Sequence, residues 1–252
     1  MKHYRAILFD LFNTVALFDP EKLPAFEWGG KFLRSTMGGV RPVVERLFPS
    51  RPFSLFFHTL TEVSRELAEV RSRDLREVSS LERFRRVLER LGEPDSPESL
   101  ARAQGLSLVH MELLATATEV PEDHRSLLAA VHKEYAVALV SNFDHAPTAR
   151  AILKKWGIEA HFDTVLISDE IGWRKPHRLI FTSALGQLGV KPQEALFVGD
   201  SVVEDVGGAK AASLDVVWVS RDGKECPADV PAPDFVVRSL PELRNIILKT
   251  KT

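Results

Sequence analysis

Five short apolar runs alternate with helical patterns in the second half of the chain, and this alternation restricts the possible folds more than any other feature. The runs are YAVALVS, TVLIS, ALFVGD, DVVWVS and a weaker DFVV, at 135–141, 164–168, 195–200, 215–220 and 234–237. Between the first two, Ala149, Ile152, Leu153 and Trp156 recur at helical spacing, and Gly157 can end that helix. Continuous Val, Ile and Leu runs joined by helices predict a parallel sheet covered on both faces.

The N-terminal run YRAILFD, at 4–10, is a further strand candidate, and a long segment of different character separates it from the others. Two stripes of apolar residues recur there at helical spacing, with Arg and Glu between them: Leu60, Val63, Leu67 and Val70, then Leu81, Phe84, Val87, Leu88 and Leu91. Asp95-Ser96-Pro97 predicts another helix start. We expect this segment to be helical throughout, with no strand. The predicted fold class is therefore α/β: a Rossmann-like parallel-sheet core of residues 1–16 and 119–252, with an inserted α-helical cap of residues 17–118.

Composition excludes several classes of partner. Lys plus Arg number 33 against 35 Asp plus Glu, for a formal net charge of -2, so no basic excess would attract nucleic acid. No apolar stretch approaches the length of a membrane span, and the first residues reach Asp10 too early for a secretory signal. The single cysteine, Cys226, is expected to be a free thiol in a reducing compartment. We predict a cytoplasmic monomer or homodimer that binds neither nucleic acid nor membranes.

Charged and hydroxyl side chains stand at the predicted carboxyl ends of the strands, which is where open parallel sheets bind ligands. The residues are Asp10 and Thr14 at or just after the end of the run at 4–10, Ser141 and Asn142 at the end of 135–141, Lys175 in the loop after 164–168, and Asp200 and Asp205 at or just after the end of 195–200. Because these strand ends meet at one edge of the sheet, we expect the side chains to converge there.

This set of side chains suits phosphoryl transfer. A carboxylate can attack phosphorus and form an aspartyl phosphate, which divides one difficult displacement into two easier ones. Carboxylate and phosphate repel each other, and the oxygens of Asp10 and Asp200 are ligands suited to Mg²⁺, which would screen that repulsion. Lys175 places positive charge where phosphoryl oxygens gather in the transition state, and Ser141 can donate a hydrogen bond to the same oxygens. We predict Mg²⁺ as the cofactor and a small phosphorylated molecule as the substrate.

Four segments carry a family resemblance. FDLFNTV, VSNFD, RKP and GDSVVED, at 9–15, 140–144, 174–176 and 199–205, resemble in this order the four motifs of the haloacid dehalogenase superfamily. The resemblance covers the whole chain, because members of this type insert a helical cap after the first motif. It implies that Asp10 is the nucleophile, that Ser141 and Lys175 bind the transferring group, and that Asp200 holds Mg²⁺.

The resemblance also implies further ligands. The backbone carbonyl of Phe12 would be a metal ligand, and Asp205 would support either the metal site or Lys175. Thr14 is predicted to contact substrate. Asn142 is predicted either to contact the ligand or to form a turn. Closure of the cap over the core would exclude water, and residues of the cap would recognise the substrate, which we expect to be a phosphate monoester.

The first motif departs from the usual phosphatase pattern. Phosphatases of this family carry a second Asp two residues after the nucleophile, where this chain has Phe12, and that Asp protonates the leaving alcohol and later activates water. Phenylalanine transfers no proton, and losing a positioned acid–base group costs on the order of a hundred- to ten-thousandfold in rate. The next residue is Asn13 where glycine is usual. A phosphatase with this motif would work slowly or use a residue of the cap as its acid–base group, and it would favour leaving groups that need no protonation, such as those of acyl and aryl phosphates.

Two other functions remain open. The first is a 2-haloacid dehalogenase-like hydrolase in which Asp10 attacks carbon, because those relatives carry an aromatic tyrosine at the position of Phe12. They need no metal, however, typically lack the pair Gly199-Asp200, and tend to have tyrosine where this chain has Phe181. The second is a module that has lost catalysis and binds a phosphate ligand or a protein. We weigh the acidic fourth motif most heavily, because neighbouring carboxylates repel each other unless a bound cation offsets their charge. We therefore favour the phosphatase.

Overall fold

The computed structural model describes residues 3–248, and these form two compact units. The first, which we call the sheet unit, contains residues 3–17, 119–143 and 153–248. The second, the helical unit, contains residues 18–118 and 144–152. The short segment 144–152, which the sequence analysis assigns to the core, groups with the helical unit by its contacts.

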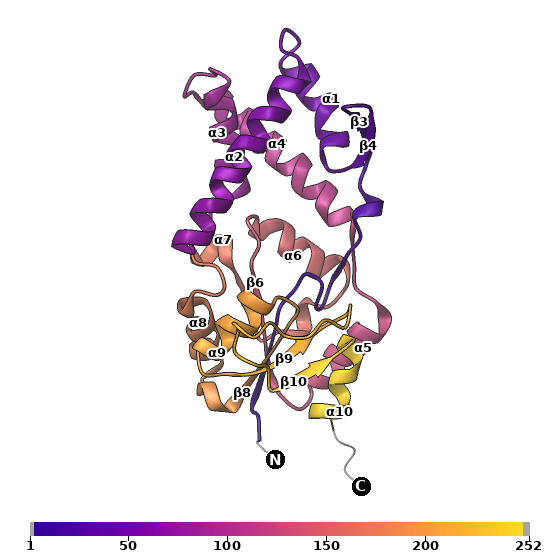
Figure 1. Cartoon of the computed structure of the whole chain (residues 1–252), viewed down its shortest axis with the longest axis vertical. Coiled ribbons are helices and arrows are strands. Elements are labelled where there is room, and N and C mark those ends of the chain that lie inside the picture. Colours follow the sequence, from indigo (N-terminus) through magenta and orange to yellow (C-terminus); the bar gives the residue numbers. More distant parts are fainter. Residues whose placement is uncertain (1–2, 249–252) are drawn as a thin grey trace. The chain divides into compact units, whose positions relative to one another are not determined.

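A parallel sheet of six strands forms the centre of the sheet unit (Figure 1). Its strand order is β10-β9-β8-β1-β6-β7, and each neighbouring pair is parallel. The strands are β1 (Ala6–Phe9), β6 (Ala136–Ser141), β7 (Thr164–Ile167), β8 (Ala195–Gly199), β9 (Asp215–Val219) and β10 (Phe235–Val237). Each of the apolar runs in the sequence forms one of these strands, so the predicted α/β fold with a Rossmann-like parallel sheet is confirmed.

Both faces of the sheet are buried at its central strands, as the continuous apolar runs predict, whereas Phe235 and Val236 of the edge strand β10 are exposed. On one face, alternate residues such as Leu8 and Phe197 pack with Phe181 of α8 (Arg178–Leu188) and with Val206. The residues between them, such as Ile7 in β1, are also without solvent exposure. The remaining helices of this unit are α5 (Glu122–Val131), the C-terminal part of α6 (Ala146–Lys155), α7 (Ser168–Ile171), α9 (Gly208–Ala211) and α10 (Arg244–Ile247).

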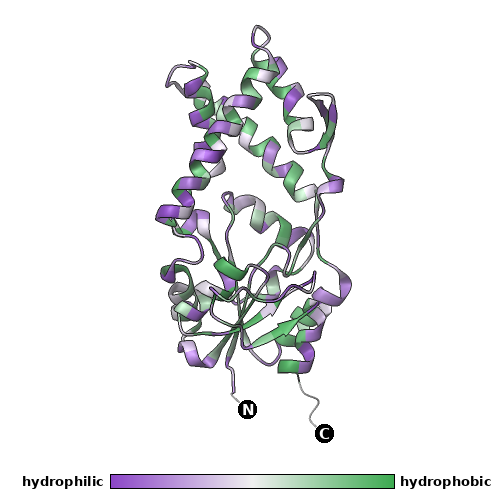
Figure 2. Ribbon diagram, viewed as in Figure 1, coloured by the Kyte–Doolittle hydropathy of each residue, from purple (hydrophilic) through white to green (hydrophobic). Residues whose placement is uncertain are grey.

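Four helices make up most of the helical unit: α1 (Met37–Leu47), α2 (Phe53–Asp74), α3 (Ser80–Arg90) and α4 (Pro97–Thr116). Hydrophobic and hydrophilic turns alternate along them in Figure 2, and the apolar stripes predicted for α2 and α3 supply Leu60, Val63 and Phe84 to one buried cluster. Helix α4 begins as predicted, with Pro97 at its first position and the side chain of Ser96 accepting a hydrogen bond from the N–H of Ser99.

The expectation that this unit contains no strand is wrong. An antiparallel hairpin joins β3 (Ala25–Trp28) to β4 (Lys31–Arg34). Its two-residue loop is Gly29-Gly30, with φ of 58° and 73°, the left-handed backbone that tight hairpin turns need. The dipeptide Gly-Gly between AFEW and KFLR was therefore a usable hairpin signal. Two further short strands, β2 (Leu17–Phe18) and β5 (Thr118–Glu119), pair with each other.

Within residues 3–248, none of the helices combines the length and the apolar character needed to cross a membrane.

Candidate active site

Three neighbouring strands deliver the predicted polar residues to one edge of the sheet. Asp10 directly follows β1, Asp200 directly follows β8, and Ser141 is the last residue of β6. Strand β1 lies between the other two. The N–H of Asp10 donates to the carbonyl of Val198 at 2.9 Å, which continues the ladder between β1 and β8 to Asp10. The indole Nε1 of Trp218 donates to the carbonyl of Asp200 at 2.9 Å and fixes the backbone there.

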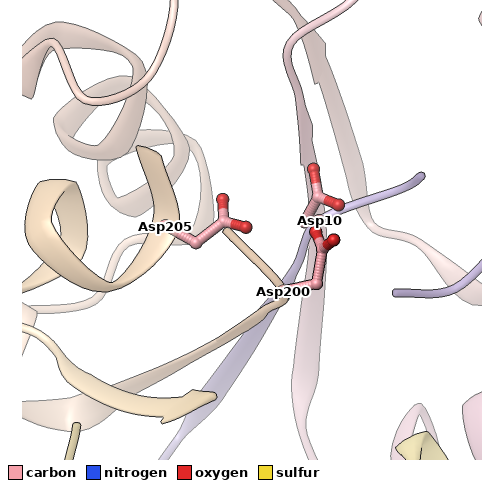
Figure 3. A group of neighbouring side chains, drawn as sticks. All are labelled: Asp10, Asp200 and Asp205. Carbon is pink, nitrogen blue, oxygen red and sulfur yellow. The ribbon is translucent and has the colours of Figure 1, made fainter. Parts of the chain in front are cut away.

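The carboxylates of Asp10, Asp200 and Asp205 form a group, which we call the acidic cluster (Figure 3). One oxygen from each residue lies within 4.8 Å of the others. Asp10 and Asp205 are buried, and Asp200 is partly buried. In Figure 3 the side chains of Asp10 and Asp200 lie next to each other, with Asp205 approaching from a separate element. The sequence prediction that these acids converge agrees with this geometry.

Lys175 is the counter-ion of the acidic cluster. Its Nζ lies 2.6 Å from Oδ1 of Asp10 and 2.7 Å from Oδ1 of Asp205, and only 1% of the side chain is exposed. Burial alone would lower the pKa of Lys175, but the carboxylates of Asp10 and Asp205 outweigh it and raise that pKa. Lys175 is therefore a fixed positive charge at neutral pH.

One lysine does not balance three carboxylates. Burial, opposed by Lys175 and aided by the charges of Asp205 and Asp200, gives Asp10 a raised pKa of about 8. Burial and the charge of Asp205 likewise raise the pKa of Asp200 to about 6. A group of carboxylate oxygens with excess negative charge is the donor set that a hard divalent cation prefers, and the cation would return these acids to their ionised forms. The residues present therefore fit Mg²⁺.

Asp205 lies in a π-helical turn, η4 (Val202–Gly207), a distortion that is frequent at functional sites. Its Oδ2 accepts a hydrogen bond from the N–H of Ser201 at 2.9 Å, while Oδ1 faces Lys175. A Cβ on Gly199 would lie only 2.4 Å from the carboxyl carbon of Asp205, so this position requires glycine. Both oxygens of Asp205 are thus engaged by groups of the chain itself.

The side chain of Asn142 brackets the backbone of Lys175. Its Nδ2 donates to the carbonyl of Lys175 at 2.9 Å, and its Oδ1 accepts from the N–H of Lys175 at 2.7 Å. The Asn142 amide therefore holds the backbone at Lys175 rather than forming a turn with its own neighbours.

The hydroxyl of Ser141 is buried and has no hydrogen-bond partner among residues 3–248. A buried hydroxyl without a partner is costly, and a bound phosphoryl oxygen would satisfy it.

The turn after Asp10 explains how the chain accommodates its unusual first motif. Asn13 adopts φ of 58°, and Asn tolerates this left-handed conformation better than most residues other than glycine. The ring of Phe12 packs against that of Phe143, with centroids 4.8 Å apart. Thr14 is fully buried, and its hydroxyl has no partner within the described part of the chain.

Sequence reasoning missed two side chains that hold this turn. Arg221, in the loop after β9, donates from Nε to the carbonyl of Asn13 at 3.0 Å and from Nη2 to that of Thr14 at 3.4 Å. The buried His124 of α5 has Nδ1 2.9 Å from the carbonyl of Val15. Neither residue lies in a motif, and a contact with a backbone carbonyl leaves no pattern in a single sequence.

Comparison with known proteins gives the family. The family model that describes haloacid dehalogenase-like hydrolases matches residues 4–213 of this chain. A glyceraldehyde 3-phosphate phosphatase of Pyrococcus furiosus is 31% identical over 148 residues, which are 58% of this chain and 61% of that protein. A phosphoserine phosphatase of Thermus thermophilus is 37% identical over 161 residues, 64% of this chain and 61% of that protein. The chain thus spans about three fifths of the length of these relatives.

Solved structures show the same fold. A 2-haloacid dehalogenase from Pseudomonas syringae aligns with 98% of this chain and 99% of its own, with a TM-score of 0.76 at 19% identity; at that identity the likeness shows the fold alone. A phosphatase of the same superfamily from Thermococcus onnurineus aligns with 96% of this chain and 97% of its own, with a TM-score of 0.56 at 26% identity. The resemblance seen in the four sequence motifs is confirmed, and the chain belongs to the haloacid dehalogenase-like hydrolase family.

Proposed function

We propose that the protein is a magnesium-dependent phosphatase that acts on a small phosphate monoester through an aspartyl phosphate on Asp10. The observation that carries the proposal is the acidic cluster, in which a buried nucleophile candidate lies beside a second carboxylate and a fixed lysine. A dehalogenase that attacks carbon has no use for the negative charge gathered there. The names of the relatives from Pyrococcus furiosus and Thermus thermophilus support the same choice.

The residues would divide the work as follows. Asp10 attacks phosphorus as the bond to the leaving oxygen breaks, and water then attacks the phosphorus of the intermediate and releases the Asp10 carboxylate. Lys175 and the free hydroxyl of Ser141 would bind the phosphoryl oxygens as their charge grows. Asp10, Asp200 and the backbone carbonyl of Phe12 would hold Mg²⁺, which when bound screens the repulsion between carboxylate and phosphate.

Three predicted residues take more specific roles. Because both oxygens of Asp205 are engaged by Lys175 and Ser201, we propose that Asp205 orients the lysine and adds charge to the metal site. Asn142 would hold the backbone of Lys175 rather than touch the substrate. The buried hydroxyl of Thr14 stays a candidate contact in the turn after the nucleophile.

Phe12 determines which substrates would react fastest. The position that normally protonates the leaving alcohol carries an apolar ring packed on Phe143, so an alkoxide would have to leave unprotonated. Acyl and aryl phosphates release much weaker bases and lose little from the missing acid. We therefore propose them as the favoured class, with the helical unit acting as the cap that selects among leaving groups.

A dehalogenase is the second candidate, because an aromatic residue at position 12 is shared with those relatives. Oxygen labelling separates the two reactions. In ¹⁸O water, a phosphatase places the label in the released phosphate, because water attacks phosphorus. A dehalogenase places it in the carboxyl group of Asp10, because water attacks the carbonyl carbon of a carbon ester.

The first experiment is a substrate panel of acyl, aryl and alkyl phosphates and 2-haloacids, each with Mg²⁺ or with EDTA. We expect phosphate release that requires Mg²⁺ and is fastest for acyl and aryl phosphates. Halide release that persists in EDTA, with ¹⁸O in Asp10, would establish the dehalogenase instead. Binding of Mg²⁺ and phosphate without any turnover would point to a module that has lost catalysis.

A further inference from the structure

Asp144 is a buried carboxylate that the proposed chemistry does not use, and two arginines of the helical unit bind it. Its Oδ2 accepts a hydrogen bond from Nη2 of Arg71 at 2.9 Å and is also paired with Nη2 of Arg83. Arg71 pairs in addition with Glu77, through Nε at 2.9 Å. We call Arg71, Glu77, Arg83 and Asp144 the arginine cluster.

The charges in the arginine cluster balance, two against two, so it calls for no ligand. His110 lies nearby in α4, and burial together with the charge of Arg83 lowers its pKa to about 4. His110 is therefore neutral near pH 7 and leaves the balance unchanged. A balanced buried cluster of this kind holds chain segments in place. The segment it holds begins at Asp144, whose backbone carbonyl also accepts from the N–H of Ser80 at 2.8 Å.

Asp144 is the last residue of the second motif, VSNFD at 140–144. Asn142, two positions earlier, makes both hydrogen bonds to the backbone of Lys175, and Ser141 is the residue before it. Phe143 is fixed as well, because its N–H lies 2.9 Å from Oγ of Ser168. The short loop 141–144 is thus held by the arginines at its end and bonded to the backbone of Lys175 near its start.

We propose that Arg71 and Arg83 are positioning residues: through Asp144 they fix loop 141–144, and through Asn142 this loop sets the position of Lys175 at the acidic cluster. The path runs from Asp144 through Phe143 to Asn142, and then across two hydrogen bonds to the backbone of Lys175. This inference rests on the proposed function, because it assigns the arginines a part in the placement of the group that would neutralise phosphoryl oxygens. Misplacing such a group by about 1 Å costs on the order of a hundredfold in rate.

The chain offers a matched control. Arg90 lies on the same helix as Arg83 and pairs with Glu66 of α2, Nη1 to Oε1, at 2.9 Å. Arg90→Met therefore removes the same kind of side chain from the same helix, α3, together with its link to α2, without touching Asp144. We expect Arg83→Met to lower kcat by about ten- to a hundredfold, with KM for an aryl phosphate within about threefold of the parent. Arg90→Met should leave both constants near the parent values.

A double-mutant cycle distinguishes positioning from general damage. If Arg83 acts through Asn142, then Arg83→Met should cause less than about a threefold further loss in an Asn142→Ala background. Two losses that multiply in full would overturn the proposal, because the arginine would then act by another route. All four proteins are assayed at a temperature where circular dichroism shows each of them folded.

Hydrogen exchange tests the same path without any assay of activity. The N–H of Lys175 is bonded to Oδ1 of Asn142 at 2.7 Å, and its exchange should become faster in Arg83→Met but not in Arg90→Met. Unchanged exchange at Lys175 in Arg83→Met would overturn the positioning role. A parent protein without phosphatase turnover would overturn the proposed function alone, since the exchange result does not depend on it.

Discussion

The two buried charge clusters of this protein differ in their balance. The acidic cluster gathers three carboxylates around Lys175 at the strand ends of the sheet unit. The arginine cluster of the helical unit pairs two cations with two anions. Both are removed from water, where an unpaired charge is costly. The arginine cluster is balanced by the chain's own charges, whereas the acidic cluster has more carboxylates than Lys175 can neutralise, so that protons or a bound cation must offset the rest. This difference in charge balance is why we propose a cation site at the acidic cluster and a structural role for the arginine cluster.

The largest expected effect lies at the nucleophile. Asp10→Asn keeps the shape of the side chain but removes the attacking charge, so turnover should fall by at least about ten-thousandfold. Glu98→Gln is the control, because it neutralises an exposed carboxylate that pairs with Arg102 in the helical unit, and turnover should not change. Phosphate release is measured under single-turnover conditions. An Asp10→Asn variant as fast as the parent would end the assignment of the nucleophile.

The next largest effect is expected at position 12 of the first motif, where the usual acid–base group is missing. Phe12→Asp restores a group that can transfer a proton to the leaving alcohol. Turnover of alkyl phosphates should rise by roughly a hundredfold or more, while that of aryl phosphates changes little. Phe12→Asn, similar in size but unable to transfer a proton, is the matched comparison. Equal rates for the two variants on alkyl phosphates would show that proton transfer is not the bottleneck.

Removing one charge from each cluster tests the comparison directly. Lys175→Met leaves buried carboxylates unbalanced, and Asp144→Asn leaves buried arginines unbalanced, so each should lower the free energy of unfolding in EDTA by about 3–5 kcal/mol. Added Mg²⁺ should recover stability in Lys175→Met only, because a cation binds the folded acidic cluster. Chemical denaturation with and without Mg²⁺ measures this difference. Equal recovery in both variants would remove the distinction between the clusters.

A smaller effect is expected from pH. In EDTA the raised pKa values of Asp10, about 8, and Asp200, about 6, mean that the folded protein holds protons that the unfolded chain releases near pH 4. Stability should therefore be greatest below pH 4 as far as these groups contribute, and should fall by a few kcal/mol as pH rises to about 8. Saturating Mg²⁺ should flatten this slope. A slope that is the same with and without Mg²⁺ would place the cation elsewhere.

The sequence predicted the sheet because strand patterns there are strong and continuous. Each apolar run became a strand, and the acids at the ends of β1 and β8 met because those strands are neighbours. The hairpin at 25–34 was not predicted because helical spacing dominates the later part of the inserted segment, at 60–91, although Gly29-Gly30 marked the turn. The two glycines thus indicated a hairpin that the helical spacing of apolar residues elsewhere in the segment did not.

The supports of the site could not be read from one sequence. Asn142 was predicted either to contact ligand or to form a turn, and it instead holds a backbone 33 positions away in the chain. The need for glycine at position 199 depends on how closely Asp205 approaches. Arg221 hydrogen-bonds to the turn after Asp10 although it lies 208 positions later in the sequence than Asn13. Each of these contacts is set by tertiary packing, which leaves no spacing rule to detect.

The most direct test of the account is to trap the intermediate. The protein is mixed with an aryl phosphate labelled with ³²P, quenched in acid within one turnover, digested and mapped by mass spectrometry. The account predicts one labelled site, the carboxyl group of Asp10, formed with Mg²⁺ and not formed with EDTA. Phosphate release at the same rate with no label on Asp10, or with label on another residue, would contradict it.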